Sequence, residues 1–201
     1  DQGLNFPVFD DGVLAFPGAE GYGKNATGAR TGEGREIYHV TNLNDAGPGS
    51  FRDAVSKPWR IIVFDVSGVI KLSKDPVVLK SNQTILGHTA PGDGIVLYNG
   101  RVSASGAQNL IVRYLRIRMG AAYPSDQVDA CGVANGADMI FDHCSMTWGR
   151  DECFSINPDG IEITEVNWSQ YCSGSPTLLE ARSDLHPIIR SQKSAQEAYE
   201  W

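Results

Sequence analysis

The sequence predicts an all-β fold, a parallel β-helix, from three observations. Helical periodicity is scarce across the 201 residues. Short β-branched runs alternate with glycine, asparagine, proline and aspartate. Similar strand-and-turn segments recur at intervals of about 25 residues and begin at Ser81, Ala107, Gly136 and Gly160. A repeat of roughly 20–30 residues built from strands and turns is typical of a solenoid, in which each coil stacks on the next.

The first 59 residues are predicted to form an N-terminal segment that caps the solenoid, because an open coil would expose strand edges. Its glycine-rich stretch "GAEGYG", residues 18–23, is expected to be a turn of this cap. The stretch lacks the G-x-x-x-x-G-K-[ST] pattern of a phosphate-binding loop. A strand is expected at residues 36–41, and a short helix near residues 50–56.

Residues 60–170 are predicted to form the coils. The run "RIIVFDVSGVIKL", residues 60–72, predicts two strands separated by a turn at Ser67 and Gly68. The last segment, residues 171–201, shows no further coil. The chain is therefore predicted to be a single domain whose β-helix is short or incomplete.

One turn position recurs in successive coils and carries polar side chains. Asn82, Asn109 and Asp138 occupy comparable places in their repeats. Polar side chains at matching turns of a solenoid can hydrogen-bond along the stack. We therefore expect these three residues to form a ladder, although a chance coincidence of polar turn residues would give the same pattern.

The composition restricts the classes of partner. The net charge of −7 argues against nucleic acid and against an anionic membrane, since both bind basic surfaces. No apolar run approaches the ~18 residues that a transmembrane helix needs. An acidic protein that binds an acidic polymer needs a cation between the two. We expect the protein to be a monomer.

Two features favour a secreted protein. The chain begins at Asp1 rather than Met, which indicates that a leader has been removed. Three N-x-S/T sequons are compatible with glycosylation, at Asn25, Asn82 and Asn167. Four cysteines fit either two disulfides or buried free thiols: Cys131, Cys144, Cys153 and Cys172.

Six blocks in one order resemble the pectate lyase family of polysaccharide lyases. The blocks are "AFPGAEGYG", "IYHVTNLNDAGPGSFRDAV", "IVFDVSGVI", "TILGHTAPGDGI", "NLIVRYLRIRMG" and "FDHCSMTWGRDE". The resemblance covers about residues 13–170, and the C-terminal segment departs from the family. It implies a right-handed parallel β-helix, secretion, calcium dependence and cleavage of polygalacturonate by β-elimination.

The resemblance implies a calcium site. It points to Asp129 in "VDACGV" and to Asp151 in "WGRDE", with Glu152 as a third candidate ligand. Carboxylate oxygens are the ligands that Ca²⁺ prefers. Structural alternatives stay open, since Asp129 could cap a turn and Asp151 could pair with an arginine. Many members carry an acid four residues after the second aspartate, where this chain has Ser155.

Arginines are the candidate ligands for an acidic substrate. Arg113, Arg116 and Arg118 recur on one predicted strand, and the last two share a face because side chains alternate along a strand. Arg116, Arg118 and Arg150 are predicted to bind galacturonate carboxylates, for which the guanidinium fork is suited. The alternative is a solvated strand face.

The residues Asp142 and His143 match the Asp-His signature of the family and are predicted to be structural. Because strand side chains alternate, one of the two should point inward and hydrogen-bond within the stack. For His143 we expect such a core position rather than a catalytic one.

The sequence does not assign the catalytic base. The family's catalytic arginine lies well downstream of the Asp-His signature, which in this chain falls near or beyond Trp201, and Arg182 and Arg190 stand in an unrelated context. The sequence therefore predicts a calcium-assisted lyase acting on an acidic, galacturonate-rich polysaccharide. Two alternatives stay open: a non-catalytic carbohydrate-binding β-helix, and a carboxylate-dependent glycoside hydrolase on the same scaffold.

Overall fold

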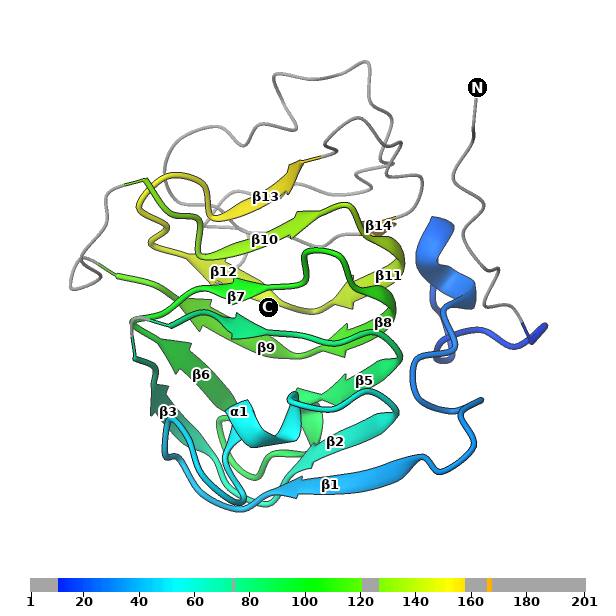
Figure 1. Ribbon diagram of the computed structural model, residues 1–201, viewed down its shortest axis with the longest axis horizontal. Coiled ribbons are helices and arrows are strands. Elements are labelled where there is room, and N and C mark those ends of the chain that lie inside the picture. The colour runs from blue at the N-terminus through cyan, green and yellow to red at the C-terminus, as the bar shows by residue number, and fades with distance from the viewer. Residues whose placement is uncertain (1–10, 74, 121–126, 158–165, 168–201) are drawn as a thin grey trace.

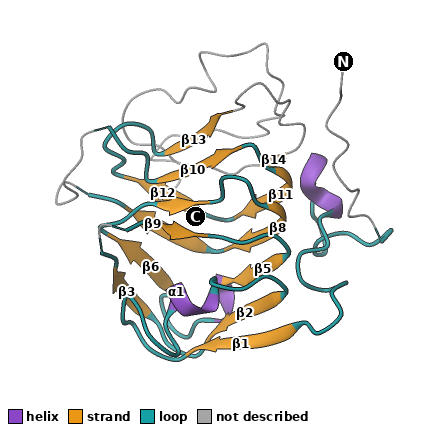
Figure 2. Cartoon of the chain, in the orientation of Figure 1, coloured by secondary structure: helices purple, strands orange, loops and turns teal. Residues whose placement is uncertain are grey.

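Three parallel sheets form the walls of a solenoid in the computed structural model, which describes residues 11–73, 75–120, 127–157 and 166–167 (Figures 1 and 2). The first sheet contains β1 (Glu36–Val40), β2 (Arg60–Phe64), β5 (Gln83–Leu86), β8 (Gln108–Arg113), β11 (Ala137–Asp142) and β14 (Val166–Asn167). The second contains β3 (Gly68–Lys71), β6 (Ile95–Tyr98), β9 (Leu115–Arg118) and β12 (Ser145–Thr147). The third contains β4 (Val77–Val78), β7 (Val102–Ser103), β10 (Cys131–Ala134) and β13 (Phe154–Asn157).

Each coil takes one strand from each sheet, as in the succession β8, β9 and β10, and then returns to the first sheet. Strands of successive coils pair in parallel, with Leu110 opposite Met139 and Val112 opposite Phe141 where β8 meets β11. The predicted parallel β-helix is confirmed. The strands expected at residues 36–41 and within residues 60–72 are also present, as β1, β2 and β3.

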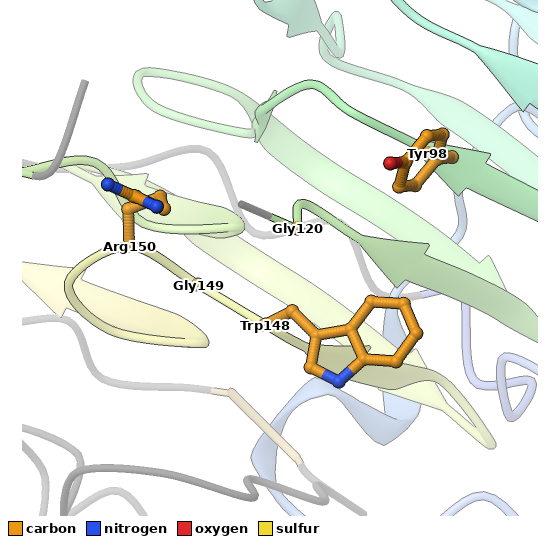
Figure 3. A pocket seen from close by; sticks show the side chains of 5 residues that line it. All are labelled: Tyr98, Gly120, Trp148, Gly149 and Arg150. Atoms are coloured by element: carbon orange, nitrogen blue, oxygen red, sulfur yellow. The ribbon is translucent and has the colours of Figure 1, made fainter. Parts of the chain in front are cut away.

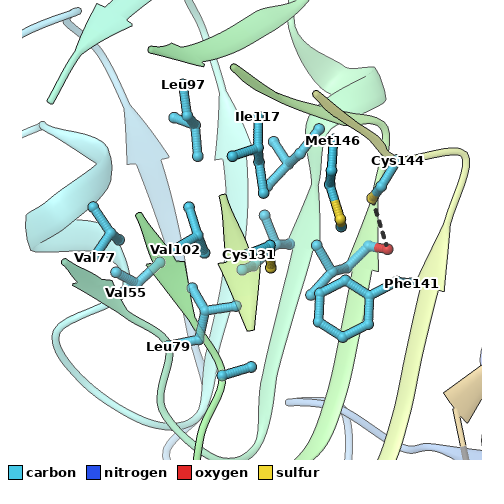
Figure 4. Close-up of a cluster of buried hydrophobic side chains, with 14 of the residues drawn as sticks. Val55, Val77, Leu79, Leu97, Val102, Ile117, Cys131, Phe141, Cys144 and Met146 are labelled. Carbon is cyan, nitrogen blue, oxygen red and sulfur yellow. Dashed lines mark hydrogen bonds between the residues drawn. The ribbon is translucent and has the colours of Figure 1, made fainter. Parts of the chain in front are cut away.

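The core fills the inside of the coils, because alternate residues of each strand point inward. On β9, Leu115 and Ile117 are buried while the residues between and after them are half-exposed. Figure 4 shows side chains of the three sheets meeting in this core. Phe141 packs edge-to-face on Phe154 with ring centroids 5.1 Å apart.

Cys131 and Cys144 are buried free thiols, and Cys153 is also buried. Burial raises the pKa of the Cys144 thiol to about 12. A thiol that stays protonated is a poor nucleophile, so Cys131 and Cys144 act as small apolar core side chains. Cys172 lies outside the described residues.

The predicted polar ladder is confirmed for Asn82 and Asn109, at the corner where β5, β8 and β11 begin. Asn82, Asn109 and Asp138 all have left-handed backbone conformations, with φ of 60°, 59° and 51°. The side-chain amide of Asn109 donates to Asn82 Oδ1 at 2.8 Å. Burial raises the pKa of the Asp138 carboxyl, which is half-buried at the same position. Asparagine and aspartate suit this corner because they tolerate positive φ better than most residues.

Two parts of the N-terminal segment take different places in the fold. The helix α1 (Phe51–Ala54) closes the first coils, with Ser50 accepting a hydrogen bond from the backbone of Asp53 and Phe51 stacking on Phe64. The glycine-rich segment, residues 18–29, includes η1 (Tyr22–Asn25) and lies along the outside of the first sheet (Figure 1). A second 3-10 turn, η2 (Gly87–Thr89), joins β5 to β6.

The glycine-rich segment is bonded to the middle coils. Asn109 Oδ1 accepts from the backbone amides of Thr27 and Gly28 at 2.8 and 2.9 Å. The backbone amide of Ala29 donates to Thr84 Oγ1 at 3.0 Å. A Cβ at Gly23 would lie 2.1 Å from the carbonyl oxygen of Met139, so only glycine allows this approach.

The second and first sheets meet at a sharp corner. Tyr114 has a φ of 56° and separates β8 from β9, so Arg113 stands on a different strand from Arg116 and Arg118. The prediction that the three arginines share one strand is therefore wrong.

In the part of the chain that the structure describes, no helix has the length and apolar character needed to cross a membrane.

Candidate functional site

Three carboxylates meet in the loops that lead from the second sheet to the third. Asp129 precedes β10, and Asp151 and Glu152 precede β13 one coil later. Each offers one oxygen, and these oxygens lie within 4.8 Å of one another. The structure thus brings together the three residues that the resemblance indicated as metal ligands.

Backbone hydrogen bonds hold the two loops in register. The amide of Ala130 donates to the carbonyl of Glu152 at 3.0 Å, and the amide of Arg150 donates to the carbonyl of Val128 at the same distance. The amide of Glu152 donates to Asp129 Oδ1 at 3.3 Å. The carboxylates therefore project from paired backbone segments rather than from independent loops.

The cluster concentrates negative charge. A hydrogen bond with Asp129, burial, and the charges of Asp129 and Asp151 raise the pKa of Glu152 to about 7. In the metal-free protein Glu152 is therefore only partly ionised near pH 7, because adjacent carboxylates repel one another. Ser155, where many family members carry an acid, is buried on β13 and adds no charge.

Arg101 is a neighbour of the cluster that sequence reasoning missed. Its Nη2 lies 3.6 Å from Asp129 Oδ2. The guanidinium lies over Gly132, where a Cβ would be 2.7 Å from Nη2. Its Nε is buried and has no hydrogen-bond partner among the described residues. Val102 pairs with Cys131, so aligning the coils would have placed Arg101 beside Ala130 and close to Asp129.

The predicted substrate arginines are distributed over two places. Arg116 and Arg118 share the outward face of β9, as predicted. Arg118 donates to the carbonyl and hydroxyl oxygens of Ser145 at 2.8 and 2.9 Å, and burial lowers the pKa of its guanidinium. Arg118 thus links β9 to β12. Arg150 lies in the loop that also carries Asp151 and Glu152.

The Asp-His signature lies at a different corner, between β11 and β12. Asp142 accepts from Arg113 Nε at 2.6 Å and lies 2.8 Å from Nδ1 of His143. The prediction of a core position for His143 is wrong. Its side chain is 56% exposed and stacks on the ring of Tyr114, with centroids 4.6 Å apart. The φ of 51° at His143 turns the side chain outward and breaks the strand alternation.

An open pocket of about 430 Å³ adjoins the loop between β12 and β13. Its described lining residues are Tyr98, Gly120, Trp148, Gly149 and Arg150 (Figure 3). Arg150 is directly followed in the chain by Asp151 and Glu152. The pocket and the carboxylate cluster therefore share the loop between β12 and β13. Arg182 and Arg190 lie outside the described residues.

The comparisons with known proteins agree with the fold and point to one family. No family model matches the chain. It is 55% identical to the probable pectate lyase C of Aspergillus flavus over 164 residues, which is 82% of this chain and 38% of that protein. It is 57% identical to the probable pectate lyase C of Aspergillus fumigatus over 155 residues, 77% of this chain and 36% of that protein.

The structural comparison shows the same fold. The crystal structure of Jun a 1, the major allergen from cedar pollen, superimposes with a TM-score of 0.58 at 22% identity. The superposition covers 77% of this chain and 49% of the allergen. The chain spans less than two fifths of the length of the fungal relatives it matches.

Proposed function

Because the chain belongs to the pectate lyase family over the region that it shares with these fungal relatives, we propose that it is a polysaccharide lyase that cleaves galacturonate-rich pectic polysaccharide. The observation that carries the proposal is the convergence of Asp129, Asp151 and Glu152 on a β-helix of this family. The proposed reaction is a calcium-assisted β-elimination.

The donor chemistry of the cluster fits Ca²⁺. All three residues supply carboxylate oxygens, which suit a hard cation, and among the described residues no imidazole or thiolate belongs to the group. The raised pKa of Glu152 shows that the cluster attracts positive charge: in the metal-free protein a proton offsets part of the repulsion among the carboxylates, and a cation would do the same. We propose that Asp129, Asp151 and Glu152 hold the ion, and that the ion links this acidic protein to an acidic polymer.

The chemistry to be assisted is the removal of a carbon-bound proton next to a uronate carboxylate. When bound, Ca²⁺ stabilises the negative charge that develops on that carboxylate. Arg150 stands beside the cluster and is suited to orient a second carboxylate of the substrate. Arg101 supplies a further positive charge next to Asp129. None of the described residues is assigned here as the base.

One observation favours a second candidate function. Glycoside hydrolases use an acid of raised pKa near a second carboxyl group, and the raised pKa of Glu152 beside Asp129 shares this feature. A hydrolase on this scaffold would release reducing ends without forming an unsaturated product, and it would not need calcium.

We also propose that the protein is secreted, because the proposed substrate is an extracellular polymer. The sequon at Asn82 is poorly suited to glycosylation, since its side chain is half-buried and accepts a hydrogen bond from Asn109.

The test is to incubate the purified protein with polygalacturonate and follow both the ultraviolet absorbance of unsaturated uronate and the release of reducing ends. A lyase gives a rise in absorbance that a chelator abolishes and added Ca²⁺ restores. The variant Asp151→Asn should require more calcium for the same rate. Reducing ends without absorbance would assign a hydrolase, and neither signal from a folded sample would assign a binding protein.

A further inference from the structure

Trp148 is a large, mainly apolar side chain that is exposed to solvent. It is 57% exposed and follows β12 directly. Its φ is 59°, a conformation that bulky side chains rarely adopt. Its carbonyl accepts a hydrogen bond from the amide of Gly120 at 3.0 Å, which anchors this backbone in the neighbouring coil. Because the ring contributes little to the core, the exposed position and the constrained backbone point to a contact with a ligand.

Tyr98 lies on the same pocket, two coils away. Tyr98 pairs with Arg118 and Arg118 pairs with Thr147, so the ends of β6, β9 and β12 are aligned. Neighbouring strands are about 4.8 Å apart, which separates the backbones of the outer two by about 10 Å. A sugar ring in van der Waals contact with an aromatic ring lies roughly 3.5–4.0 Å from it, so this strand spacing leaves room for one sugar ring against either aromatic side chain.

The coil between the two aromatic residues carries a glycine. A Cβ at Gly120 would lie 3.0 Å from Tyr98 Cε2, and its φ of 77° also favours glycine. Figure 3 shows Tyr98 and Trp148 at one end of the pocket, Arg150 at the other end, and Gly120 on the side of the two aromatic residues that faces Arg150. The missing side chain leaves space beside the Tyr98 ring.

The lining suits one class of ligand. The C–H face of a pyranose is apolar and packs against an aromatic ring, while its polar edge needs hydrogen-bonding or charged partners. Arg150 supplies a positive charge on the same pocket, which is complementary to a uronate. The loop that carries Trp148 continues into Asp151 and Glu152, so a chain bound here would extend to the cluster.

We propose that Trp148, with Tyr98 and Arg150, forms a stacking subsite that binds one galacturonate residue of the polymer independently of calcium. The proposal rests on the proposed function, because it takes the same polymer as its ligand. The subsite anchors the chain beside the carboxylate cluster, and it contributes affinity rather than reaction chemistry.

Calorimetric titration with trigalacturonate in the presence of EDTA tests the subsite. Trp148→Asn removes the ring but keeps a residue that tolerates positive φ. We expect it to weaken binding about tenfold, and Trp148→Phe about twofold to threefold, since ring contact area decreases in that order. Tyr114→Asn is the matched control, because Tyr114 is also an exposed aromatic residue with positive φ, at the opposite end of β9. It should leave the affinity unchanged.

The outcomes separate the subsite from the lyase activity. Unchanged affinity in Trp148→Asn, or no binding by the unaltered protein in EDTA while calcium-dependent cleavage is present, would overturn the subsite and leave the proposed function standing. Binding that depends on Trp148 without cleavage at any calcium level would support the subsite and overturn the lyase. Weaker binding of the methyl ester of trigalacturonate would support the contact with Arg150, and equal binding would overturn that contact.

Discussion

Arg101 and Asp129 stand on successive coils and bring a positive charge within 3.6 Å of the proposed calcium site, measured from Nη2 to Oδ2. The position of the guanidinium depends on Gly132, because any side chain there would collide with it. The same carboxylate also accepts a backbone hydrogen bond from Glu152. Asp129 thus interacts both with the charge of Arg101 and with the backbone amide of Glu152.

The variant Arg101→Gln should bind Ca²⁺ more tightly than the unaltered protein. The guanidinium competes with a cation for Asp129, and two unit charges at this separation near a surface interact by up to about 4 kcal/mol before solvent screening. After screening we expect roughly a threefold to tenfold decrease in the calcium Kd, measured by calorimetric titration. Arg35→Gln, an exposed residue of the N-terminal segment, is the control. A higher calcium Kd would mean instead that Arg101 holds Asp129 in position.

The stability of the metal-free protein should fall as the pH rises from about 4.5 to about 7. The pKa of Glu152 is raised from 4.5 to about 7 in the fold, so the folded state binds more protons than the unfolded state within this window. Raising the pH removes that proton and leaves three adjacent charged carboxylates.

Calorimetric melting in EDTA across this pH range measures the effect. Glu152→Gln should flatten the profile, whereas Glu33→Gln, at an exposed position, should not. Added calcium should restore stability at pH 7. A melting temperature that increases over the window in the unaltered protein would contradict the proton on Glu152.

Asn109→Ala should be among the most destabilising changes outside the apolar core. Asn109 is fully buried, accepts from two backbone amides of the glycine-rich segment and donates to Asn82. Leaving buried donors unpaired costs about 1–3 kcal/mol each, so we expect a loss of at least ~2 kcal/mol in the free energy of unfolding.

Hydrogen exchange of residues 18–29 separates the role of this side chain from general destabilisation. In Asn109→Ala these amides should exchange much faster than the amides of β8, while Ser105→Ala, on another part of the same coil, should leave them protected. Equal protection in both variants would show that the segment is held by other contacts.

Gly23→Ala should also destabilise the protein, because the new Cβ would lie 2.1 Å from the carbonyl oxygen of Met139 on β11. Forcing this contact apart should cost about 1–3 kcal/mol in urea unfolding. Gly106→Ala is the control: nothing lies within 4 Å of its Cβ, and only its φ of 70° opposes the change, at about 1 kcal/mol. A smaller loss for Gly23→Ala than for Gly106→Ala would show that the segment can move away from the sheet.

The sequence by itself determined the repeat, and with it the β-helix. The spacing of the segments that begin at Ser81, Ala107 and Gly136 fixes which residues share a place in successive coils. Equal places in stacked coils are neighbours in space, so the ladder of Asn82 and Asn109 could be predicted. The carboxylate cluster was predicted from the aligned context of the family blocks, which encode the same stacking.

The tertiary structure decided features that depend on how the corners bend and how the loops pair. A left-handed φ at His143 turned outward a side chain that strand alternation placed inside. The glycine-rich segment lies along the first sheet because its backbone bonds to Asn109, a partner more than eighty positions away. Arg101 reaches Asp129 only through the register of β7 with β10 and the open space above Gly132. Local sequence patterns report periodicity along the chain, whereas these contacts arise from backbone angles and pairings between distant segments, which only the folded chain fixes.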